Sequence, residues 1–419
     1  MKKNFSELSF EFLLDLNYNL KQEFRVLEKF PKRKKSFILS GIGLFFAALL
    51  KSLFNGLIRF PEFDKDGLIV ASTSNNSKVL FPIFQSRNDC NYLGNGYHYP
   101  IPKFWAYYFG LPYFFYLLRI IPNKGNYERE VYVSFFHLFW LSYGYLIFWR
   151  KALDKWKPKF VIVSNDHLLL YRSLLHVCKE LDIQTIYVQH AGTSINFPPL
   201  TFTYAFLDGQ QTYDNYLSHG EKNTSKIYLI GSPRFDKLVN IRQSRRYSSV
   251  KCIGVSLNLL DDLEKVQYFL EQLVILKRFQ IKVRFHPGFS QIKLKKFYDK
   301  LTNMGVQVSF PYKEPLDVYF TKIDFHIAGV SFIHFEAILS GINSVLGRFQ
   351  DFNDDPYAFS SSGFITDFDL QQFINGEIQY CTSGHQEAIL MNYVSNYNEL
   401  LKGKSTLASY NSIINNINF

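Results

Sequence analysis

Short apolar segments alternate with helical segments from about residue 158 onward, and this alternation restricts the chain to an α/β fold with parallel strands. The first segment, 159–166, is apolar almost without interruption, which is typical of a strand buried on both faces of a parallel sheet. A helix that ends at about Glu180 separates it from the next strand. The strands predicted in this half of the chain cover residues 159–166, 185–190, 202–207 and 226–231.

The alternation stops at residues 240–251 and then begins again. This segment is polar, basic and rich in serine, so we interpret it as the linker between two domains. A chain of 419 residues also exceeds the size of one ordinary core. We therefore predict two doubly wound, Rossmann-like domains that face a central cleft. The second domain is predicted to contain strands at 252–258, 281–288, 306–310, 324–331 and 343–348 and helices at 260–278, 291–303 and 332–340.

The predicted division of the chain has four parts. Residues 1–60 form an N-terminal helical segment, and residues 61–240 form the first Rossmann-like domain, which would hold the acceptor. Residues 252–385 form the second Rossmann-like domain, which would hold the nucleotide donor. Residues 386–419, with a helix at 386–402, are expected to pack back on the first domain.

An uncharged, apolar run covers residues 36–50, close to the N-terminus. Its 15 residues are fewer than the roughly 20 that span a bilayer. Between Lys32 and Pro61 the chain carries six basic residues and no acidic one. The run therefore predicts either a helix that lies in an anionic membrane face or a buried helix at the edge of the first domain.

A second uncharged run, from Val131 to Trp149, has 19 residues and nine aromatic side chains. Its length alone is that of a transmembrane helix. However, it contains His137 and Ser142, and it leads directly into the strand predicted at 159–166. We favour a helix packed inside the first domain over a transmembrane helix.

The charge and the cysteines narrow the classes of function. The formal net charge of +11 favours an anionic partner, such as nucleic acid, an anionic lipid surface or a phosphorylated substrate. The four cysteines are scattered, without a CxxC pair, which argues against a secreted disulfide scaffold and a structural zinc site. The N-terminal residues lack the pattern of a secretory signal peptide. We expect a cytoplasmic protein, peripheral on the inner face of the cytoplasmic membrane.

Polar side chains follow six of the predicted strands at the point where each strand ends. Open parallel sheets bind their ligands at the carboxyl ends of the strands, so these side chains are candidate site residues. In the first domain they are Asn165, Asp166, Gln189, His190, Ser232 and Arg234. In the second domain they are Ser256, Asn258, Arg284, His286 and Ser331.

Two units of the second domain are suited to a nucleotide. Pro287 fixes the backbone after His286, and Gly288 permits the close approach of a phosphate or ribose, although an isolated His-Pro pair is more typical of a turn. Ser331 stands at the start of the helix predicted at 332–340, where free N–H groups and the helix dipole favour a phosphate. Glu336 follows one turn later, where its carboxylate would accept hydrogen bonds from ribose hydroxyls.

The first domain offers two candidates for a general base, Asp166 and His190. A base that removes a proton from a sugar hydroxyl must be in its basic form near neutral pH, and both residue types satisfy this condition. The sequence does not choose between them. We interpret His176 as structural and leave His167 open. No cofactor is expected besides the donor substrate, and no metal is required.

These units in their order resemble bacterial surface-polysaccharide glycosyltransferases of the GT-B fold. The similarity covers about residues 158–348 and is carried by Gln189-His190-Ala191, Ser232-Pro-Arg234, Arg284-Phe-His286-Pro287, Gly329-Val-Ser331 and Glu336. Among these enzymes the chain is most similar to CMP-nonulosonate transferases (of the sialyl, polysialyl and Kdo types) and to teichoic-acid polyol-phosphate transferases. The resemblance implies that His286, Ser331 and Glu336 hold the CMP moiety of the donor.

The hypothesis that follows is an inverting, metal-independent glycosyltransferase. It would move an acidic sugar (sialic acid, Kdo or a related nonulosonate) from a CMP donor to a capsule or lipopolysaccharide acceptor. The alternative is transfer of polyol phosphate from CDP-glycerol or CDP-ribitol. A non-catalytic membrane or nucleic-acid-binding protein is disfavoured because basic–aromatic RNA-binding signatures are absent from the sequence. The expected partners are a nucleotide-sugar donor, an oligosaccharide or glycolipid acceptor and an anionic membrane surface, without nucleic acid.

Overall fold

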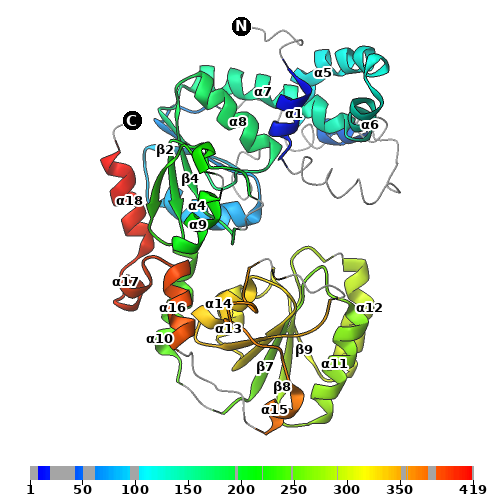
Figure 1. Ribbon diagram of the computed structural model, residues 1–419, viewed down its shortest axis with the longest axis vertical. Coiled ribbons are helices and arrows are strands. Elements are labelled where there is room, and N and C mark those ends of the chain that lie inside the picture. The colour runs from blue at the N-terminus through cyan, green and yellow to red at the C-terminus, as the bar shows by residue number, and fades with distance from the viewer. Residues whose placement is uncertain are drawn as a thin grey trace.

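The computed structural model contains two parallel β-sheets, each covered by helices, in an upper and a lower domain (Figure 1). This confirms the predicted α/β fold class with two Rossmann-like domains. The structure describes residues 8–18, 43–50, 62–94, 103–193, 197–218, 220–246, 249–289, 291–350, 355, 357–375 and 384–417.

The first sheet has six parallel strands in the order β2-β1-β3-β4-β5-β6. The sequence pattern missed the first two strands and the helix α4 (Ser74–Gln85) between them, because aromatic runs dominate the chain before residue 158. All residues of β1 are buried, so this strand lacks the alternation that marks a half-exposed strand. The strands are β1 (Gly67–Ala71), β2 (Cys90–Gly94), β3 (Phe160–Val163), β4 (Gln184–Val188), β5 (Tyr204–Leu207) and β6 (Lys226–Leu229).

The second sheet has five parallel strands in the order β11-β10-β7-β8-β9. Every strand here was predicted, and each is shorter than its prediction by two to four residues because the polar residues at its end belong to the following loop. The strands are β7 (Cys252–Ser256), β8 (Gln280–Arg284), β9 (Gln307–Ser309), β10 (Phe325–Ala328) and β11 (Asn343–Leu346). The helices are α11 (Leu263–Ile275), α12 (Gln291–Asn303), α13 (Leu316–Phe320), α14 (Ile333–Leu339) and α15 (Leu370–Ile374).

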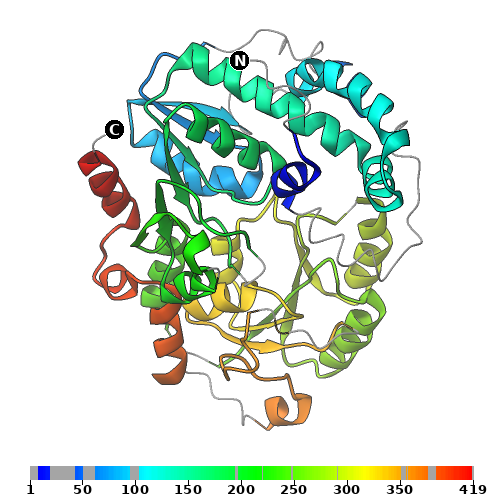
Figure 2. The same ribbon diagram turned by 45° about the horizontal axis from the view of Figure 1, so that its top comes forward.

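A group of helices extends the first domain on one side of its sheet (Figure 2). The prediction of one continuous helix at 131–149 is wrong. The helix is interrupted at Phe135, and α6 and α7 on either side of it meet at a bend of 76°. As predicted, α7 packs inside the domain, where most of its side chains are buried. The helices and 3₁₀ turns of this domain are α1 (Phe10–Leu16), α5 (Lys103–Ile120), η2 (Ile121–Asn123), α6 (Asn126–Ser134), α7 (Phe136–Trp156), α8 (Leu169–Glu180), α9 (Gln210–Leu217) and η3 (Gly220–Lys222).

Helices α5 and α7 pack so closely that their backbones touch. A Cβ atom added at Gly144 on α7 would overlap the backbone carbonyl of Ala106 on α5. We therefore expect Gly144→Ala to destabilise the protein by at least about 2–3 kcal/mol, since a backbone cannot move aside as a side chain can. Gly125→Ala is the control, because a Cβ atom there meets nothing within 4 Å. Its unfolding free energy, measured by urea denaturation, should stay within about 0.5 kcal/mol of the wild type.

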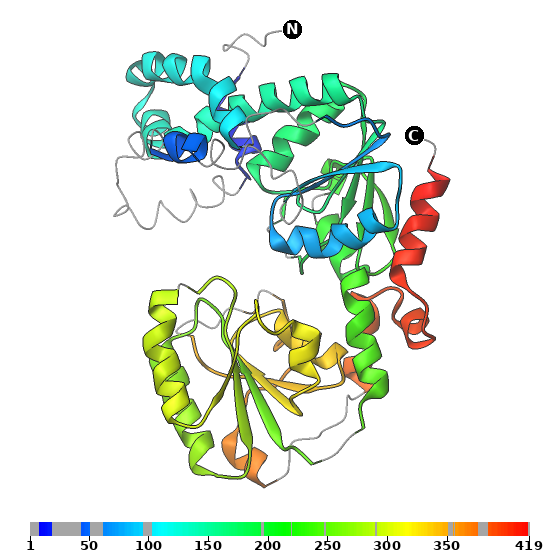
Figure 3. The ribbon, with the colours of Figure 1, turned by 180° about the vertical axis from the view of Figure 1, so that it is seen from behind.

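The segment predicted as a linker is not an open linker. Its first part belongs to α10 (Pro233–Ser244), which lies between the two domains (Figure 3). Arg242 donates from Nη1 to the carbonyl of Ile338, and Arg245 donates to the carbonyls of Phe320 and Ile323. The arginines of this segment therefore bind the second domain, because their guanidinium groups donate hydrogen bonds to carbonyls at the ends of α13 and α14.

The C-terminal region contains three helices, so the single helix predicted at 386–402 is wrong. They are α16 (Gly384–Tyr393), α17 (Tyr397–Leu401) and α18 (Thr406–Asn416). Leu390 of α16 and Leu400 of α17 pack into a core cluster that also contains α10 and α14. Tyr410 of α18 packs on Phe206 of the first sheet, so the chain ends beside the first domain (Figures 1 and 3).

No single helix in the described ranges is long and apolar enough to cross a membrane. Residues 43–50 of the apolar run at 36–50 are helical, and Phe45 packs against Tyr107 and Trp140. Residues 36–42 and the basic cluster at 32–35 lie outside the described residues.

Candidate functional site

Loops from the carboxyl ends of both sheets meet at the boundary between the domains. Gly192, after β4, lies so close to Phe332, after β10, that an added Cβ atom would be 2.5 Å from its ring. Arg234, after β6, places its guanidinium 5.6 Å from the centre of the same ring. Strand ends of parallel sheets are the usual ligand-binding edges, so this boundary is the candidate site.

A carboxylate–imidazole pair lies at the end of β3. Oδ1 of the buried Asp166 is 2.9 Å from Nδ1 of His167, and its Oδ2 accepts a hydrogen bond of 2.8 Å from the hydroxyl of Tyr216. The amide Nδ2 of Asn165 lies 3.4 Å from Nε2 of His167. The tautomer that satisfies these contacts carries its proton on Nδ1, which leaves the Nε2 lone pair as the acceptor. The His167 ring is partly exposed, so Nε2 is the basic atom of the pair.

His190, one of the two predicted bases, lies near this pair. Its ring centroid is 6.5 Å from that of His167, and the two rings are nearly parallel. Burial lowers the pKa of His190 to about 4, although the charge of Asp166 works in the opposite direction. A base with so low a pKa holds a proton weakly at neutral pH. Asp166, the other predicted base, is buried with both oxygens occupied by His167 and Tyr216.

Arg234 forms a buried ion pair that the sequence analysis did not predict. Its Nη2 is 2.7 Å from Oδ2 of Asp208, and its Nη1 donates to the backbone carbonyl of His190 at 3.1 Å. Burial raises the pKa of Asp208 to about 6, and the adjacent guanidinium lowers it. The guanidinium also lies 4.3 Å from the ring centre of Phe235. Arg234 thus holds the loops after β4 and β5 together at the domain boundary.

Gln189 and Ser232 are buried inside the first domain. Gln189 donates to the carbonyl of Ala191 and to Thr212, and it accepts from the backbone N–H of Asp208. All of its hydrogen-bonding groups are therefore used within the fold. The hydroxyl of Ser232 is fully buried and has no partner in the part of the chain that the structure describes. The assignment of Gln189 and Ser232 to substrate binding stays a prediction.

Glu336, on α14, lies within electrostatic reach of cations from both domains. Burial raises its pKa, and the positive charges of Arg234, Lys78 and Arg284 lower it. Lys78 belongs to α4 of the first domain, so cations of both domains surround this carboxylate. Among the described residues, no side chain hydrogen-bonds to it. A partly exposed carboxylate with open acceptor positions, set among cations, is suited to hydroxyl groups of a ligand.

Arg284 and Asn258 mainly connect loops of the second domain. Nη1 of Arg284 donates to Oγ of Ser309 and to the carbonyl of Glu314, both at 2.9 Å. Nδ2 of Asn258 donates to the carbonyl of Val330 at 2.8 Å. The bonds of Arg284 connect the end of β8 with the end of β9 and the loop that follows, and the bond of Asn258 connects the loops after β7 and β10. The charge of Arg284 still acts on Glu336, so Arg284 contributes to the potential of the site.

Ser256 lies in a buried chain of hydrogen bonds beneath the site. Its Oγ is 2.9 Å from Nε2 of His326, whose Nδ1 is 2.7 Å from Oγ of Ser344. The same Ser344 oxygen is 2.7 Å from Nδ1 of His334, and Nε2 of His334 is 2.9 Å from the carbonyl of Gly329. Because a carbonyl oxygen only accepts, Nε2 of His334 carries the proton in its contact with Gly329. It follows that Nδ1 of His334 accepts from Ser344, which accepts from Nδ1 of His326, and that Nε2 of His326 accepts from Ser256. Both imidazole rings are neutral in this arrangement. Ser256 is therefore part of a buried hydrogen-bond network, and its assignment to nucleotide binding stays a prediction.

This network predicts that the protein loses stability in mild acid. Burial lowers the pKa of His334 to about 4 and that of His326 well below 6.5, so the unfolded chain binds more protons below pH 6.5. The stability is fully present above pH 6.5 and is lost as the pH falls toward 4. For His334 alone we expect a loss of about 2 kcal/mol between pH 7 and pH 5.

Urea denaturation at both pH values, for the wild type and His334→Gln, measures this effect. The variant should have a shallower dependence on pH. Asp208, whose pKa is raised, acts in the opposite direction, but it is present in both proteins and cancels in the comparison. Equal pH slopes would contradict a neutral, buried His334.

The His-Pro unit lies at the surface after β8. His286 and Pro287 are exposed, and Nδ1 of His286 accepts a hydrogen bond of 3.0 Å from the backbone N–H of Gly288. Partial loss of solvation lowers the pKa of His286, so the neutral ring prevails at pH 7. The remaining nitrogen, Nε2, is available to a ligand as an N–H donor. The prediction that His286 contacts a nucleotide remains open on this geometry.

Ser331 lies before the N-terminus of α14 and is not its N-cap residue. The helix α14 begins at Ile333 with Phe332 in the N-cap position, and Oγ of Ser331 lies a long 3.4 Å from the N–H of Ile333. Because α14 has only seven residues, its helix dipole is small. Gly329 packs against Asp261, where an added Cβ atom would overlap the carboxylate. The glycine is therefore needed for packing between loops.

No group of three or more His, Cys, Asp or Glu side chains within the described ranges could hold a metal ion. The chain does contain two Asp-x-Asp pairs, at 64–66 and 367–369. Asp66 pairs with Lys159 before β1 and β3, on the opposite edge of the first sheet from the site. Asp369 caps α15. Neither pair lies at the boundary between the domains.

The site contains four residues that the sequence reasoning did not assign. His167 was visible in the sequence next to Asp166, and its position directly after a strand end was the available signal. Asp208 also follows a strand, but only the folded chain shows its ion pair with Arg234. Tyr216 and Lys78 belong to helices, and nothing in the sequence connects them to the site.

Comparisons with known proteins agree with this architecture. No protein-family model matches the chain, and no curated protein matches its sequence. The crystal structure of UDP-GlcNAc 2-epimerase from Neisseria meningitidis bound to UDP-GlcNAc is similar with a TM-score of 0.50 and 14% identity, covering 84% of this chain and 100% of that chain. A candidate UDP-N-acetylglucosamine 2-epimerase from Listeria monocytogenes is similar with a TM-score of 0.50 and 10% identity, covering 84% and 98%. At these identities the likeness shows the fold alone: two Rossmann-like domains in a GT-B-like arrangement.

Proposed function

We propose that the chain is an inverting, metal-independent glycosyltransferase that uses a nucleotide-activated sugar. The observation that carries the proposal is the Asp166–His167 pair at the boundary of the domains, across from Glu336 and its surrounding cations. A base on one domain and a cation-lined carboxylate on the other match the two halves of a glycosyl transfer. The donor we favour is a CMP-activated acidic sugar, on the resemblance of the strand-end motifs.

In the proposed reaction, an acceptor hydroxyl attacks the anomeric carbon of the donor sugar. The new bond forms between the acceptor oxygen and this carbon, while the bond between the carbon and the phosphate oxygen breaks. Its electron pair stays on the departing CMP. The hydroxyl proton moves to Nε2 of His167, and Asp166 stabilises the imidazolium that forms through the Nδ1 contact. Release of this proton to water restores the base.

Residues on the second domain would hold the donor. Glu336 has open acceptor positions for ribose hydroxyls, and Arg284, together with Lys78 of the first domain, supplies positive potential for phosphate. His286 would donate from Nε2 to the departing phosphate, because its Nδ1 is occupied by the N–H of Gly288. Ser256, Gln189 and Ser232 have no contact role in this scheme.

A donor panel tests the proposal. The purified chain would be incubated with CMP-sialic acid, CMP-Kdo, CDP-glycerol, CDP-ribitol and UDP-GlcNAc, with and without glycan acceptors, and nucleotide release would be measured. We expect turnover with a CMP-sugar, increased by a suitable acceptor, and loss of that turnover in His167→Ala. Turnover with CDP-glycerol or CDP-ribitol alone would replace the leading donor by a polyol phosphate.

A sugar-nucleotide epimerase is the second candidate. The observation in its favour is the fold likeness, over 84% of the chain, to an epimerase bound to UDP-GlcNAc. Such an enzyme would convert UDP-GlcNAc without any acceptor. The same panel separates the two, since formation of an epimeric sugar from UDP-GlcNAc alone would favour the epimerase and contradict the transferase.

A further inference from the structure

The outer face of α5 (Lys103–Ile120) is apolar and exposed. The helix contains no acidic residue, and its charged residues, Lys103 and Arg119, stand at its two ends. Apolar side chains occur all round the helix, a pattern that is typical of a helix with no face toward water. Inward-facing residues such as Tyr113 are indeed buried against α7, but the opposite face is open.

The exposed residues of α5 form a stripe. Tyr108, Pro112, Phe115 and Leu118 follow one another at intervals of three or four residues, which places them on one side of the helix. Tyr108 is 49% exposed, Phe115 65% and Leu118 42%. In soluble proteins, single exposed apolar residues are common, but a continuous apolar stripe marks a surface for interaction.

The helical residues 43–50 widen this stripe. Phe45 packs edge-on against Tyr107 and beside Phe104, which attaches this segment to the start of α5. Its other large side chains point outward, and no charge occurs among these eight residues. The exposed large residues are Leu44, Phe46 and Leu50. We call the surface formed by residues 43–50 and the stripe of α5 the apolar face.

The charged residues of α5 and of the segment that contains residues 43–50 are basic. Lys103 and Arg119 stand on α5, whereas Lys124, after this helix, forms an ion pair with Glu128 of α6. The sequence on both sides of residues 43–50, from Lys32 to Pro61, adds six more basic residues and no acidic one. A protein partner with an apolar surface would not require this one-sided charge, whereas an anionic lipid surface does.

We propose that the apolar face docks on an anionic lipid bilayer, with α5 and residues 43–50 lying in the plane of the headgroups. The aromatic and leucine side chains would enter the boundary between headgroups and acyl chains, and the flanking lysines and arginines would contact lipid phosphates. The face lies at the end of the first domain remote from α18 (Figures 1 and 3). The inference stands independently of the proposed reaction.

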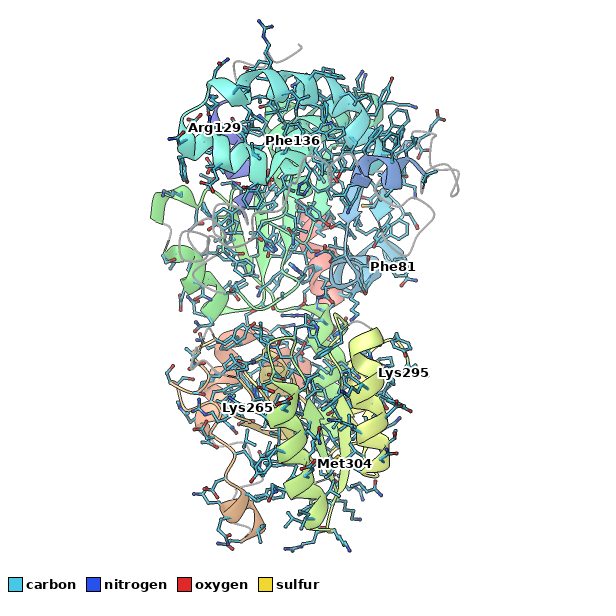
Figure 4. The ribbon with its side chains drawn as sticks, turned by 90° about the vertical axis from the view of Figure 1, so that its right-hand side faces the viewer. Phe81, Arg129, Phe136, Lys265, Lys295 and Met304 are labelled. Atoms are coloured by element: carbon cyan, nitrogen blue, oxygen red, sulfur yellow. The ribbon has the colours of Figure 1, made fainter. Side chains whose placement is uncertain are left out.

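Other exposed apolar residues do not form such a surface. Tyr268 and Ile275 on α11 are 67% and 68% exposed, but this helix also carries Glu264 and Glu271. Tyr268 and Ile275 lie on the same helix of the second domain as Lys265. Arg129, by contrast, lies among the helices at the far end of the first domain (Figure 4). Tyr268 and Ile275 therefore provide a control that is more exposed than the stripe of α5 but lies outside the apolar face.

Vesicle co-sedimentation with the full chain tests the proposal. We expect the wild type to bind vesicles that contain about one-third phosphatidylglycerol and to bind poorly to pure phosphatidylcholine, with binding weakened by about 0.5 M NaCl. The variant Tyr108→Ser/Phe115→Ser/Leu118→Ser should bind at least about tenfold more weakly. The control variant Tyr268→Ser/Ile275→Ser should bind as the wild type does.

Three outcomes would overturn the proposal: no binding of the wild type to the anionic vesicles, unchanged binding by the triple variant, or equal loss in the control variant. Circular dichroism and the melting temperature would verify that both variants fold, which is expected because the replaced side chains are exposed. Light scattering measures the molar mass in solution and so tests whether a second copy of the chain, in place of a membrane, covers the apolar face. A wild-type dimer that becomes a monomer in the triple variant would assign the face to self-association and reject the membrane.

Discussion

Replacing His167 with alanine is expected to lower kcat by a factor of about 10²–10⁴, the usual contribution of a general base. The Michaelis constant for the donor should change little, because His167 belongs to the first domain and the donor is assigned to the second. The geometric reason is the 2.9 Å contact of its Nδ1 with Asp166, which leaves Nε2, at 3.4 Å from the Asn165 amide, as the basic atom of the ring. Steady-state kinetics on the donor found by the panel would measure both constants.

Three further variants make this test specific. Asp166→Asn should also lower kcat, because an amide stabilises the imidazolium less than a carboxylate does. His176→Ala is the control, since His176 pairs with Glu180 on α8 away from the site. His190→Ala should cost much less than His167→Ala, given that burial lowers the pKa of His190 to about 4. A larger loss in His190→Ala than in His167→Ala would move the base to His190.

Replacing Arg234 with alanine should lower the free energy of unfolding by about 3–5 kcal/mol, because Asp208 would be left charged and unpaired in the interior. The side chains of Arg234 and Asp208 are only 17% and 3% exposed, and their charged atoms are 2.7 Å apart. Burial already raises the pKa of Asp208 to about 6. Without the guanidinium this pKa would rise further, so the variant should regain part of its stability when the pH is lowered toward 5.

The ion pair between Arg348 and Asp367 is the matched control for this prediction. Its charged atoms are also 2.7 Å apart, but the side chains are 56% and 53% exposed. Arg348→Ala should therefore cost less than about 1 kcal/mol. The double variant Arg234→Met/Asp208→Asn should be more stable than Arg234→Ala, since it removes both charges together. Similar losses for Arg234→Ala and Arg348→Ala in urea denaturation would show that burial does not strengthen the pair.

Much of the second domain could be predicted from the sequence because its strands are fully buried and separated by clear polar segments. The prediction was weaker in the first 157 residues, where β1 and β2 were missed and the run at 131–149 was assigned one helix. Aromatic residues there support helix packing, sheet burial and surface exposure alike, so hydrophobicity alone does not distinguish these roles. The bend at Phe135 depends on how α7 packs against α5 and α8.

The sequence predicted the location of the candidate site better than it predicted the individual side chains that form it. Strand ends in a parallel sheet share one edge, and this rule located Asp166, His190 and Arg234 close to the domain boundary. The rule does not say which polar groups are already satisfied within the fold. Gln189, Ser256 and Nη1 of Arg284 are used by partners 19 to 70 residues away in the chain.

The sequence by itself determined the two-domain α/β architecture and the edge of each sheet that carries the polar residues. Both follow from local patterns, since the period of apolar residues sets the element type and the break in each pattern sets its end. Only the tertiary structure decided that Asp166 orients His167, that Arg234 is held by Asp208, and that Glu336 keeps open acceptor positions among cations of both domains. The physical reason is that hydrogen bonds and burial at these positions depend on strand order and on the packing of two domains, and neither is encoded in the pattern of any one segment.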